Sequence, residues 1–163
     1  MSFADGGERE PTGRLLFYLT AFDASAQDAA ANASASLTLC ELQLPGACLG
    51  KDPQARAPAR RPLAPAGMVE SGCGGSSAAQ DPSCAKASLT GELLPVPRAG
   101  RAEAARLLFS RHPAMRGWPA SHGFTLYELH VASVRLLDSF GGAQDVSASD
   151  YYAAGSELWR ATA

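Results

Sequence analysis

Apolar residues in the first forty positions form two strand-like runs separated by a helix signal. Residues 14–20 are a compact apolar run after a Glu-Pro-Thr-Gly turn signal and predict a buried strand. Asp23 suits the N-cap of a short alanine-rich helix over Ala24–Ala31. Asn32 then suits the left-handed position that ends such a helix. Residues 35–44 alternate apolar and polar side chains and predict a half-exposed strand.

The pattern after residue 84 predicts a strand followed by a helix. Residues 84–96 carry spaced alanines and leucines interrupted by Gly91, which is typical of a strand with a bulge. Residues 98–109 have helical periodicity, and Pro113 closes that helix. The apolar side of the helix consists of Ala104, Leu107 and Leu108.

The longest strand signal covers residues 124–138. Its apolar positions change face along the run, which predicts a strand partly buried on both faces, or bent at a bulge, as in a small closed barrel. Glu128 and His130 share one face and are interpreted as a solvated or interface pair. Residues 149–152 begin a short helix. Strands outnumber helices, so the expected fold is mainly β with α decorations.

Residues 45–83 differ in composition from the rest of the chain. They contain six of the eleven prolines and six of the sixteen glycines, with few side chains able to offset the entropy lost on ordering. We expect a disordered insertion; a basic docking site at Arg60 and Arg61 is the alternative to a solvated linker. All twelve aromatic residues lie outside residues 23–108, so one core is expected to draw on both ends of a single domain, 1–163.

Composition and charge narrow the function classes. The net charge of the 163 residues is −2, and no strongly cationic face is available to neutralise phosphates, which argues against nucleic-acid binding. No apolar run approaches the roughly 20 residues that span a bilayer. The printed sequence begins without a basic leader or an apolar segment, so it is expected to encode no signal peptide.

A series of uncommon residues is spaced along the 44 positions from 109 to 152. It comprises Phe109 to Met115, Trp118, Pro119, Ser121, His122, Phe124, residues 137–143, and Asp150 to Tyr152. The series strongly resembles the CREG family of secreted or lysosomal glycoproteins, whose fold is the FMN-binding split β-barrel. Weaker agreement in the first half involves residues 2–6, residues 17–20, Asn32 and residues 37–39.

The resemblance covers most of the chain except the insertion at 45–83, where relatives have a shorter loop. In relatives, the match to residues 2–6 follows a first helix and a first barrel strand. We therefore expect a split barrel that lacks its first strand through N-terminal truncation, with any signal peptide lost as well. The family also implies a homodimer, an unidentified protein partner and a secreted, lysosomal or vacuolar location.

Flavin-using split barrels of the pyridoxamine 5'-phosphate oxidase-like superfamily resemble this chain, but they hold the FMN phosphate with a Ser-Arg-Lys loop. Asp23, Ala24 and Ser25 stand at those positions, so both cations are missing and a carboxylate is present. Only Thr20 and Ser25 could contact the phosphate, and they are better interpreted as strand-end and helix-cap residues. No cofactor is expected, and FMN is the alternative.

The sequence contains few other candidates for metal-binding or catalytic residues. His112 and His122 could hold a metal or haem, as some split barrels do, but we expect His112 to pack beside Pro113 and donate to a carbonyl at the helix end. The sequence contains no His-Glu-x-x-His, Gly-x-Ser-x-Gly or Cys-x-x-Cys spacing, so no metal site and no catalytic residue is predicted. In CREG relatives the 112–124 surface supports the dimer. Structural or interface roles are therefore assigned to Arg111, His112, Pro113, Trp118 and His122.

Two modifications depend on the compartment. Cys48 and Cys84 match cysteines that flank the shorter loop of relatives, where they could form a disulfide in an oxidising compartment; in a reducing one they are small apolar residues. Asn32, Ala33 and Ser34 form a glycosylation sequon, although Asn32 also has the helix-terminating role.

These observations predict a non-catalytic, CREG-like glycoprotein of the secretory or lysosomal system. It would act through homodimerisation and binding of a protein partner. The alternative is an FMN-binding oxidoreductase of the pyridoxamine-phosphate-oxidase-like superfamily, in which neutral donors hold the flavin.

Overall fold

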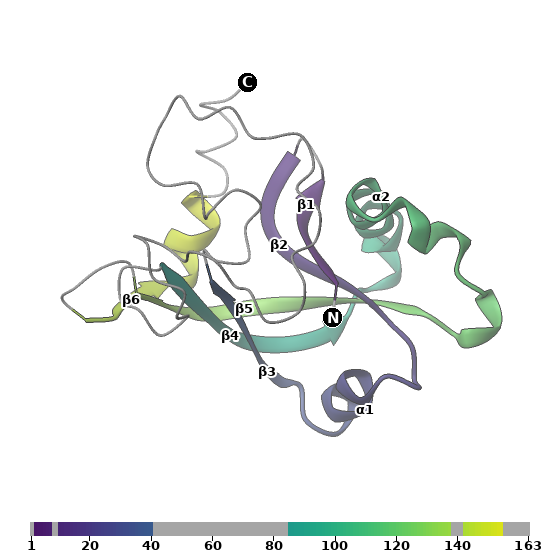
Figure 1. Ribbon diagram of the computed structural model, residues 1–163, viewed down its shortest axis with the longest axis horizontal. Coiled ribbons are helices and arrows are strands. Elements are labelled where there is room, and N and C mark those ends of the chain that lie inside the picture. The colour runs from purple at the N-terminus through teal and green to yellow at the C-terminus, as the bar shows by residue number, and fades with distance from the viewer. Residues whose placement is uncertain (1, 8–9, 41–84, 138–141, 155–163) are drawn as a thin grey trace, which may run out of the picture. The chain divides into compact units, whose positions relative to one another are not determined.

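A computed structural model describes residues 2–7, 10–40, 85–137 and 142–154 of the chain (Figure 1). The strands are β1 (Phe3–Gly7), β2 (Glu10–Leu19), β3 (Ser34–Cys40), β4 (Lys86–Pro95), β5 (Thr125–Leu137) and β6 (Gln144–Ser147). The helices are α1 (Ala24–Ala31) and α2 (Arg101–Arg111), the 3-10 turns η3 (Arg98–Gly100), η4 (Pro113–Gly117) and η5 (Ala120–His122), and residues 148–154. The predicted predominance of strands is confirmed.

The strands form one hydrogen-bonded sheet in the order β1-β2-β5-β4-β3, and β6 also pairs with β5. The pairing of β1 with β2 and of β2 with β5 is antiparallel, and Phe17 faces Phe3 on one side and Tyr127 on the other. The register shifts between Ala4 and Gly6, where β1 contains an irregularity. Strands from the first twenty residues therefore lie beside a strand that is more than a hundred positions further along the chain.

The chain divides into two compact units. The first comprises Met1–Ser36, Leu89–Val134 and Val146–Ala163, and the second comprises Leu37–Ser88 and Arg135–Asp145. Every residue of the candidate site below belongs to the first unit. In the second unit, the hydroxyls of Thr38 and Ser88 lie 3.1 Å apart and Arg135 pairs with Asp145 on the surface. The predicted insertion, residues 45–83, lies outside the described residues.

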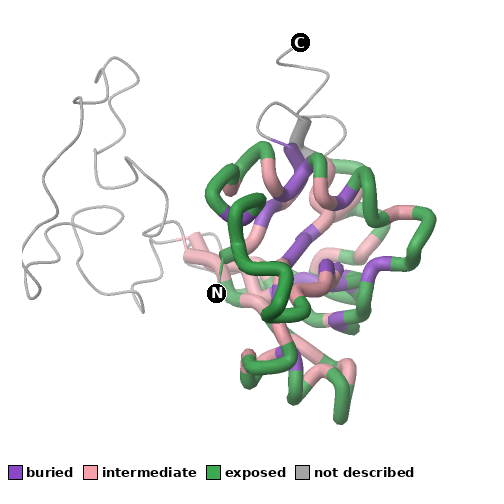
Figure 2. Tube along the Cα trace, turned by 90° about the vertical axis from the view of Figure 1, so that its right-hand side faces the viewer, coloured by how far each residue is buried: buried purple, intermediate pink, exposed green. Residues whose placement is uncertain are grey.

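The first unit has a leucine-rich core beneath α2. Ala104, Leu107 and Leu108 of this helix are fully buried, as their spacing predicts. They pack in one cluster with Leu16 of β2 and Leu126 of β5. Figure 2 marks such buried positions in purple. Each buried leucine contributes about 1.5–3 kcal/mol of transfer free energy, so this cluster fixes α2 against the sheet.

The short helix α1 begins as predicted and ends differently. Asp23 caps it by accepting the N–H of Ser25 at 2.9 Å. Asn32 was expected in the left-handed region, and that expectation is wrong, because its φ and ψ are −151° and 116°. The chain enters β3 two residues later and needs an extended backbone there, so the Asn32 side chain accepts the N–H of Ser34 at 3.0 Å instead.

Gly91 lies within β4, where the backbones of β4 and β5 approach closely. A Cβ on Gly91 would lie 1.9 Å from the carbonyl oxygen of His130. A glycine is therefore required at this position for steric reasons, whatever the conformation of the strand.

The long strand β5 is partly buried on both faces, as predicted. Leu126 and Glu128 are buried on one face, and Leu129 and Val131 on the other. The interpretation of Glu128 and His130 as a solvated or interface pair is wrong for Glu128, which is only 8% exposed. The carboxylate of Glu128 has a cationic partner, Arg14, on the neighbouring strand.

Candidate functional site

The turn from β2 into α1 carries Thr20 and Ser25, the two residues that could contact the phosphate if FMN were bound and that are expected to have strand-end and helix-cap roles. The backbone N–H of Ser25 donates to the Asp23 carboxylate at 2.9 Å. The backbone carbonyl of Asp23 accepts the N–H groups of Ala26 and Gln27 at 3.0 and 3.1 Å. The amides that a phosphate would use at this helix start are thus satisfied within the turn, and they lie beside a negative charge.

The Thr20 hydroxyl is also engaged. It donates to the backbone carbonyl of His122, and its oxygen lies 3.5 Å from the N–H of Phe22. Thr20 therefore ties the turn after β2 to the end of η5. This long-range contact has no signature in the local sequence around either residue.

The end of α2 is fixed to β1 by two adjacent side chains. Arg111 forms an ion pair with Asp5 at 2.6 Å, and both side chains are exposed. The Nε2–H of His112 donates to the carbonyl of Phe3 at 2.8 Å. The expected bond from His112 to a carbonyl at the helix end is therefore corrected, because the acceptor belongs to β1. Pro113 begins η4 directly afterwards.

Six rings form what we call the aromatic surface. Its members are Tyr18, Phe22, Phe109, Trp118, His122 and Phe124. Tyr18 lies at the centre: its ring stacks on those of Phe124 and Trp118, with centroids 4.8 and 6.0 Å away, and meets Phe109 edge-on at 5.3 Å. The Arg116 guanidinium lies 5.8 Å from the centroid of the Phe109 ring.

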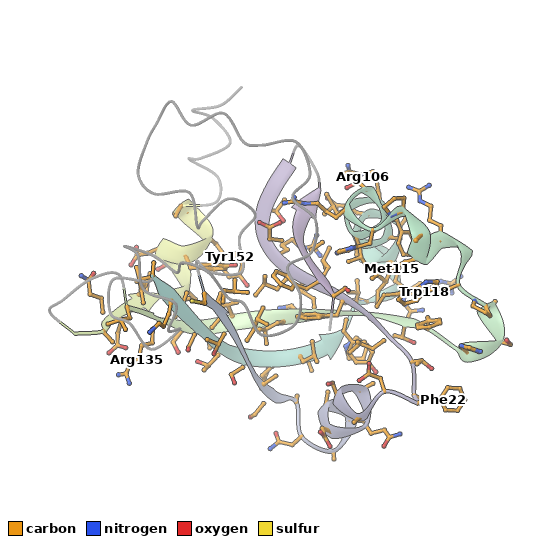
Figure 3. The ribbon with its side chains drawn as sticks, viewed as in Figure 1. Phe22, Arg106, Met115, Trp118, Arg135 and Tyr152 are labelled. Carbon is orange, nitrogen blue, oxygen red and sulfur yellow. The ribbon has the colours of Figure 1, made fainter. Side chains whose placement is uncertain are left out.

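Three members of the aromatic surface, Phe22, Trp118 and His122, are open to solvent. Phe22 is 77% exposed and Trp118 is 40% exposed. Figure 3 shows Phe22 pointing away from the ribbon, and Trp118 beside the η4–η5 segment. The ring of His122 lies 6.2 Å from Phe22 and 6.0 Å from Phe124. The sequence analysis identified Trp118 and His122 from the family resemblance but missed Phe22, because a single aromatic residue in a loop has no periodic pattern.

A buried ion pair lies beneath α2. The Nε and Nη2 groups of Arg14 donate to the two carboxylate oxygens of Glu128 at 2.8 and 2.7 Å. The pKa of Arg14 is raised above its usual value, chiefly by the hydrogen bond to Glu128. Sequence analysis missed this pair, although each residue is a lone charge within an apolar run. A single basic residue in one apolar strand and a single acidic residue in another is the signal that could have indicated the ion pair.

The helix at residues 148–154 is attached to the sheet by two tyrosines. The Tyr151 hydroxyl donates to the carbonyl of Gly13 at 2.7 Å, and the N–H of Val131 donates to the Tyr152 hydroxyl at 3.1 Å. Burial raises the pKa of Tyr151 to about 12, with smaller contributions from Tyr152 and Asp5. Both hydroxyls are used to hold the helix.

Other predicted sites have these positions. Asn32 is exposed at the end of α1. Cys48 and Cys84 lie outside the described residues. Across the described ranges, no three His, Cys, Asp or Glu side chains come together as a metal-binding group. None of the helices in this part of the chain is both long and apolar enough to cross a lipid bilayer.

Comparisons with known proteins agree with this architecture. The family described as "CREG, beta-barrel" matches residues 1–153. Mouse protein CREG2 is 29% identical over 154 residues, which cover 94% of this chain and 45% of that protein. Chicken protein CREG1 is also 29% identical, over 93% of this chain and 67% of its own length. The chain thus spans about half of the first relative and two thirds of the second.

Solved structures share the fold. A heme binding protein from Mycobacterium smegmatis has a TM-score of 0.53 at 16% identity, over 87% of this chain and 45% of that one. Protein Atu2129 (unknown function) from Agrobacterium tumefaciens has a TM-score of 0.52 at 15% identity, over 90% and 45%. The predicted fold class, mainly β and of split-barrel type, is confirmed.

Proposed function

This chain belongs to the CREG β-barrel family, and from that membership and the site geometry we propose that it is a non-catalytic glycoprotein of the secretory or lysosomal system. It acts as a homodimer that binds a protein partner. Its barrel presents the surfaces that bind the second protomer and the partner, and it does not hold a flavin as an enzyme would.

The position of Asp23 carries this proposal. The Asp23 carboxylate caps α1, in the turn that corresponds, by resemblance, to the phosphate-binding loop of flavin-using split barrels. A dianionic phosphate within about 4 Å of a carboxylate is repelled by about 1 kcal/mol per pair of charges in water, and by several times more near a protein surface. The turn, residues 20–25, contains no lysine or arginine to offset this repulsion. The residues present therefore do not fit the phosphate of FMN.

The neutral donors of the turn do not compensate. The Thr20 hydroxyl already donates to the backbone carbonyl of His122, and the Ser25 N–H already donates to the Asp23 carboxylate. A flavin would have to displace both contacts to gain two neutral hydrogen bonds, which are weaker than charge-assisted ones. No reaction step is therefore assigned to a flavin.

The secretory assignment agrees with the sequon at Asn32. Its side chain is exposed, and the chain is extended there, so the acceptor nitrogen can be reached from solvent. In a secreted product we expect a glycan at this position. Endoglycosidase treatment that changes the mobility of the wild-type chain but not of Asn32→Gln would identify it.

The test uses the chain expressed through a eukaryotic secretory pathway and purified without added cofactor. We expect no visible flavin absorbance, no change in thermal unfolding with added FMN, and a dimer by sedimentation velocity. Stoichiometric flavin in the purified protein would establish the oxidoreductase alternative instead. A monomer at all concentrations would refute homodimerisation.

A further inference from the structure

Asp5 and Gly6 form the only Asp-Gly pair in the sequence. In such a pair the backbone nitrogen of the glycine can attack the carboxyl carbon of the aspartate and close a five-membered ring, because glycine has no Cβ to obstruct the closure. The pair lies within β1, where the register against β2 shifts between Ala4 and Gly6. A chemically reactive sequence is therefore placed at the irregular part of this strand.

The backbone at Gly6 explains why a glycine follows Asp5. Gly6 has a φ of 133°, a conformation that residues with a side chain rarely adopt. Replacement of Gly6 by a residue that hinders ring closure would therefore strain β1. The side chain of Asp5 is 44% exposed, so water reaches its carboxylate. The fold thus retains the residue that makes the preceding aspartate most reactive.

Three contacts hold Asp5 and the chain beside it. Arg111 of α2 pairs with the Asp5 carboxylate at 2.6 Å, and the Thr12 hydroxyl donates to the Asp5 carbonyl at 3.3 Å. Two residues earlier, the Phe3 carbonyl accepts the Nε2–H of His112 at 2.8 Å. Ring closure needs the carboxyl carbon to turn onto the nitrogen of Gly6 and the main chain around Asp5 to rotate. It therefore proceeds from a state in which β1 has opened locally.

We propose that Asp5–Gly6 is a site of spontaneous isoaspartate formation that the contacts from α2 keep closed. The nitrogen of Gly6 forms a bond to the carboxyl carbon of Asp5. The hydroxyl of the protonated carboxyl group leaves with the amide proton as water, which gives a cyclic succinimide. Water then adds to either ring carbonyl. Opening at the main-chain carbonyl gives isoaspartate, and opening at the other regenerates aspartate, so the mass is unchanged and no oxidant or reductant is needed.

The product alters β1. In isoaspartate the main chain runs through the former side chain and gains a methylene carbon between Asp5 and Gly6. The register in which Ala4 faces Leu16 and Gly6 faces Pro11 no longer fits a longer chain. The carboxylate is now attached directly to Cα, which shortens its reach toward α2. Isomerised chains therefore open β1 more readily than unmodified ones.

The experiment follows isoaspartate in the full chain during several weeks of warming at neutral pH. Isoaspartate is quantified by enzymatic methylation with an isoaspartyl methyltransferase and located by electron-transfer fragmentation in a mass spectrometer. A synthetic peptide of residues 1–12 gives the rate without a fold. We expect isoaspartate at Asp5 in both, with the wild-type chain slower than the peptide by more than about tenfold, because ring closure waits for local opening.

Variants of the α2 contacts test the control of opening. His112→Ala should accelerate isomerisation by about fivefold, as expected from the loss of one hydrogen bond to a carbonyl. Arg111→Gln should accelerate it by about twofold to fivefold, since its ion pair is exposed. Arg98→Gln removes an equal charge from an exposed position on η3 and should leave the rate unchanged.

Two substitutions at Asp5 identify the ring closure itself. Asp5→Glu keeps a carboxylate, but its attack would require a six-membered ring, so no isomerisation is expected. Asp5→Asn closes the same five-membered ring with loss of ammonia, and its conversion to aspartate and isoaspartate changes the mass of the chain. His112→Ala should accelerate this conversion by the same factor as the isomerisation of Asp5, because both reactions depend on one opening of β1.

Three results would overturn the proposal. An absence of isoaspartate at Asp5 in the peptide would show that the pair is not reactive. Equal rates in the peptide and the folded wild-type chain would show that β1 does not protect it. Equal rates in His112→Ala, Arg111→Gln and the wild type would show that α2 does not control the opening. None of these measurements depends on a flavin or on a protein partner, so they do not test the proposed function.

Discussion

Arg14 of β2 and Glu128 of β5 form a two-pronged ion pair, with nitrogen–oxygen distances of 2.8 and 2.7 Å, beneath α2. Glu128 is almost fully buried, whereas Arg14 keeps partial access to solvent and lies 3.8 Å from Glu103 of the helix. The pair thus joins β2 to β5, two paired strands from distant parts of the sequence. Arg14 and Glu128 are not equivalent, because only Arg14 has a second ion-pairing contact, with Glu103.

Removing each partner of this pair should give unequal effects. Arg14→Met leaves a buried carboxylate without its cation and should lower the free energy of unfolding by about 3 kcal/mol. Glu128→Leu leaves a guanidinium that still reaches Glu103 and water, so a smaller loss of about 1–2 kcal/mol is expected. The double variant should be more stable than Arg14→Met alone, as urea unfolding can show. Additive losses would mean that the pair contributes no coupling.

Gly91 should tolerate no side chain. In Gly91→Ala the new methyl would lie 1.9 Å from the carbonyl oxygen of His130, and its three nearest atoms all belong to the backbone of β5, so β4 and β5 would have to separate. We expect a loss of more than about 3 kcal/mol in unfolding free energy, or failure to fold. Gly117→Ala is the matched control, because nothing lies within 4 Å of its added Cβ; it should change stability by less than about 0.5 kcal/mol.

Tyr151 should make stability depend on pH in the alkaline range. Its pKa is raised from 10 to about 12, chiefly by burial, so the folded state holds the phenol proton more tightly than the unfolded state. This contribution is complete below pH 10 and decreases as the pH rises from 10 through 12. Urea midpoints measured over that range should fall more steeply for the wild type than for Tyr151→Phe. Parallel profiles would show that another group is responsible.

The elements that sequence analysis predicted well depend on neighbouring residues. The buried side of α2 follows from the spacing of Ala104, Leu107 and Leu108, and the start of α1 follows from Asp23, because helix periodicity and capping are local. The short strand β6 was missed, since its four mostly polar and exposed residues show no apolar alternation.

The features that sequence analysis could not predict depend on residues far apart in the chain. Arg14 and Glu128 are separated by 114 positions, and His112 and Phe3 by 109. Glu128 was interpreted as solvated and His112 as bonded at its own helix end, because neither true partner is near in the sequence. For the candidate site, the resemblance identified Trp118 and His122, but only the fold places Phe22 beside His122.

The clamp between α2 and β1, formed by the Arg111–Asp5 ion pair and the hydrogen bond from His112 to Phe3, should control the local opening of β1. His112→Ala removes the bond to the Phe3 carbonyl and should lower stability by about 1 kcal/mol, because that acceptor loses its partner. Hydrogen exchange in β1 should accelerate more than in β4, which the clamp does not touch. Asp5→Ala breaks only an exposed ion pair and should have an effect below about 1 kcal/mol. Uniform acceleration of exchange in both strands would instead indicate global destabilisation.

Asp23 has two roles, helix cap and negative charge, which different substitutions separate. Asp23→Ala loses the side-chain acceptor for the Ser25 N–H and should destabilise the chain by about 1 kcal/mol. Asp23→Asn keeps an acceptor and should be nearly neutral in stability. If the carboxylate is what repels phosphate, Asp23→Asn should bind FMN weakly and Asp23→Arg more tightly, whereas the wild type shows no saturable quenching of flavin fluorescence. Equal quenching by all four chains would show that the charge at this turn does not govern flavin binding.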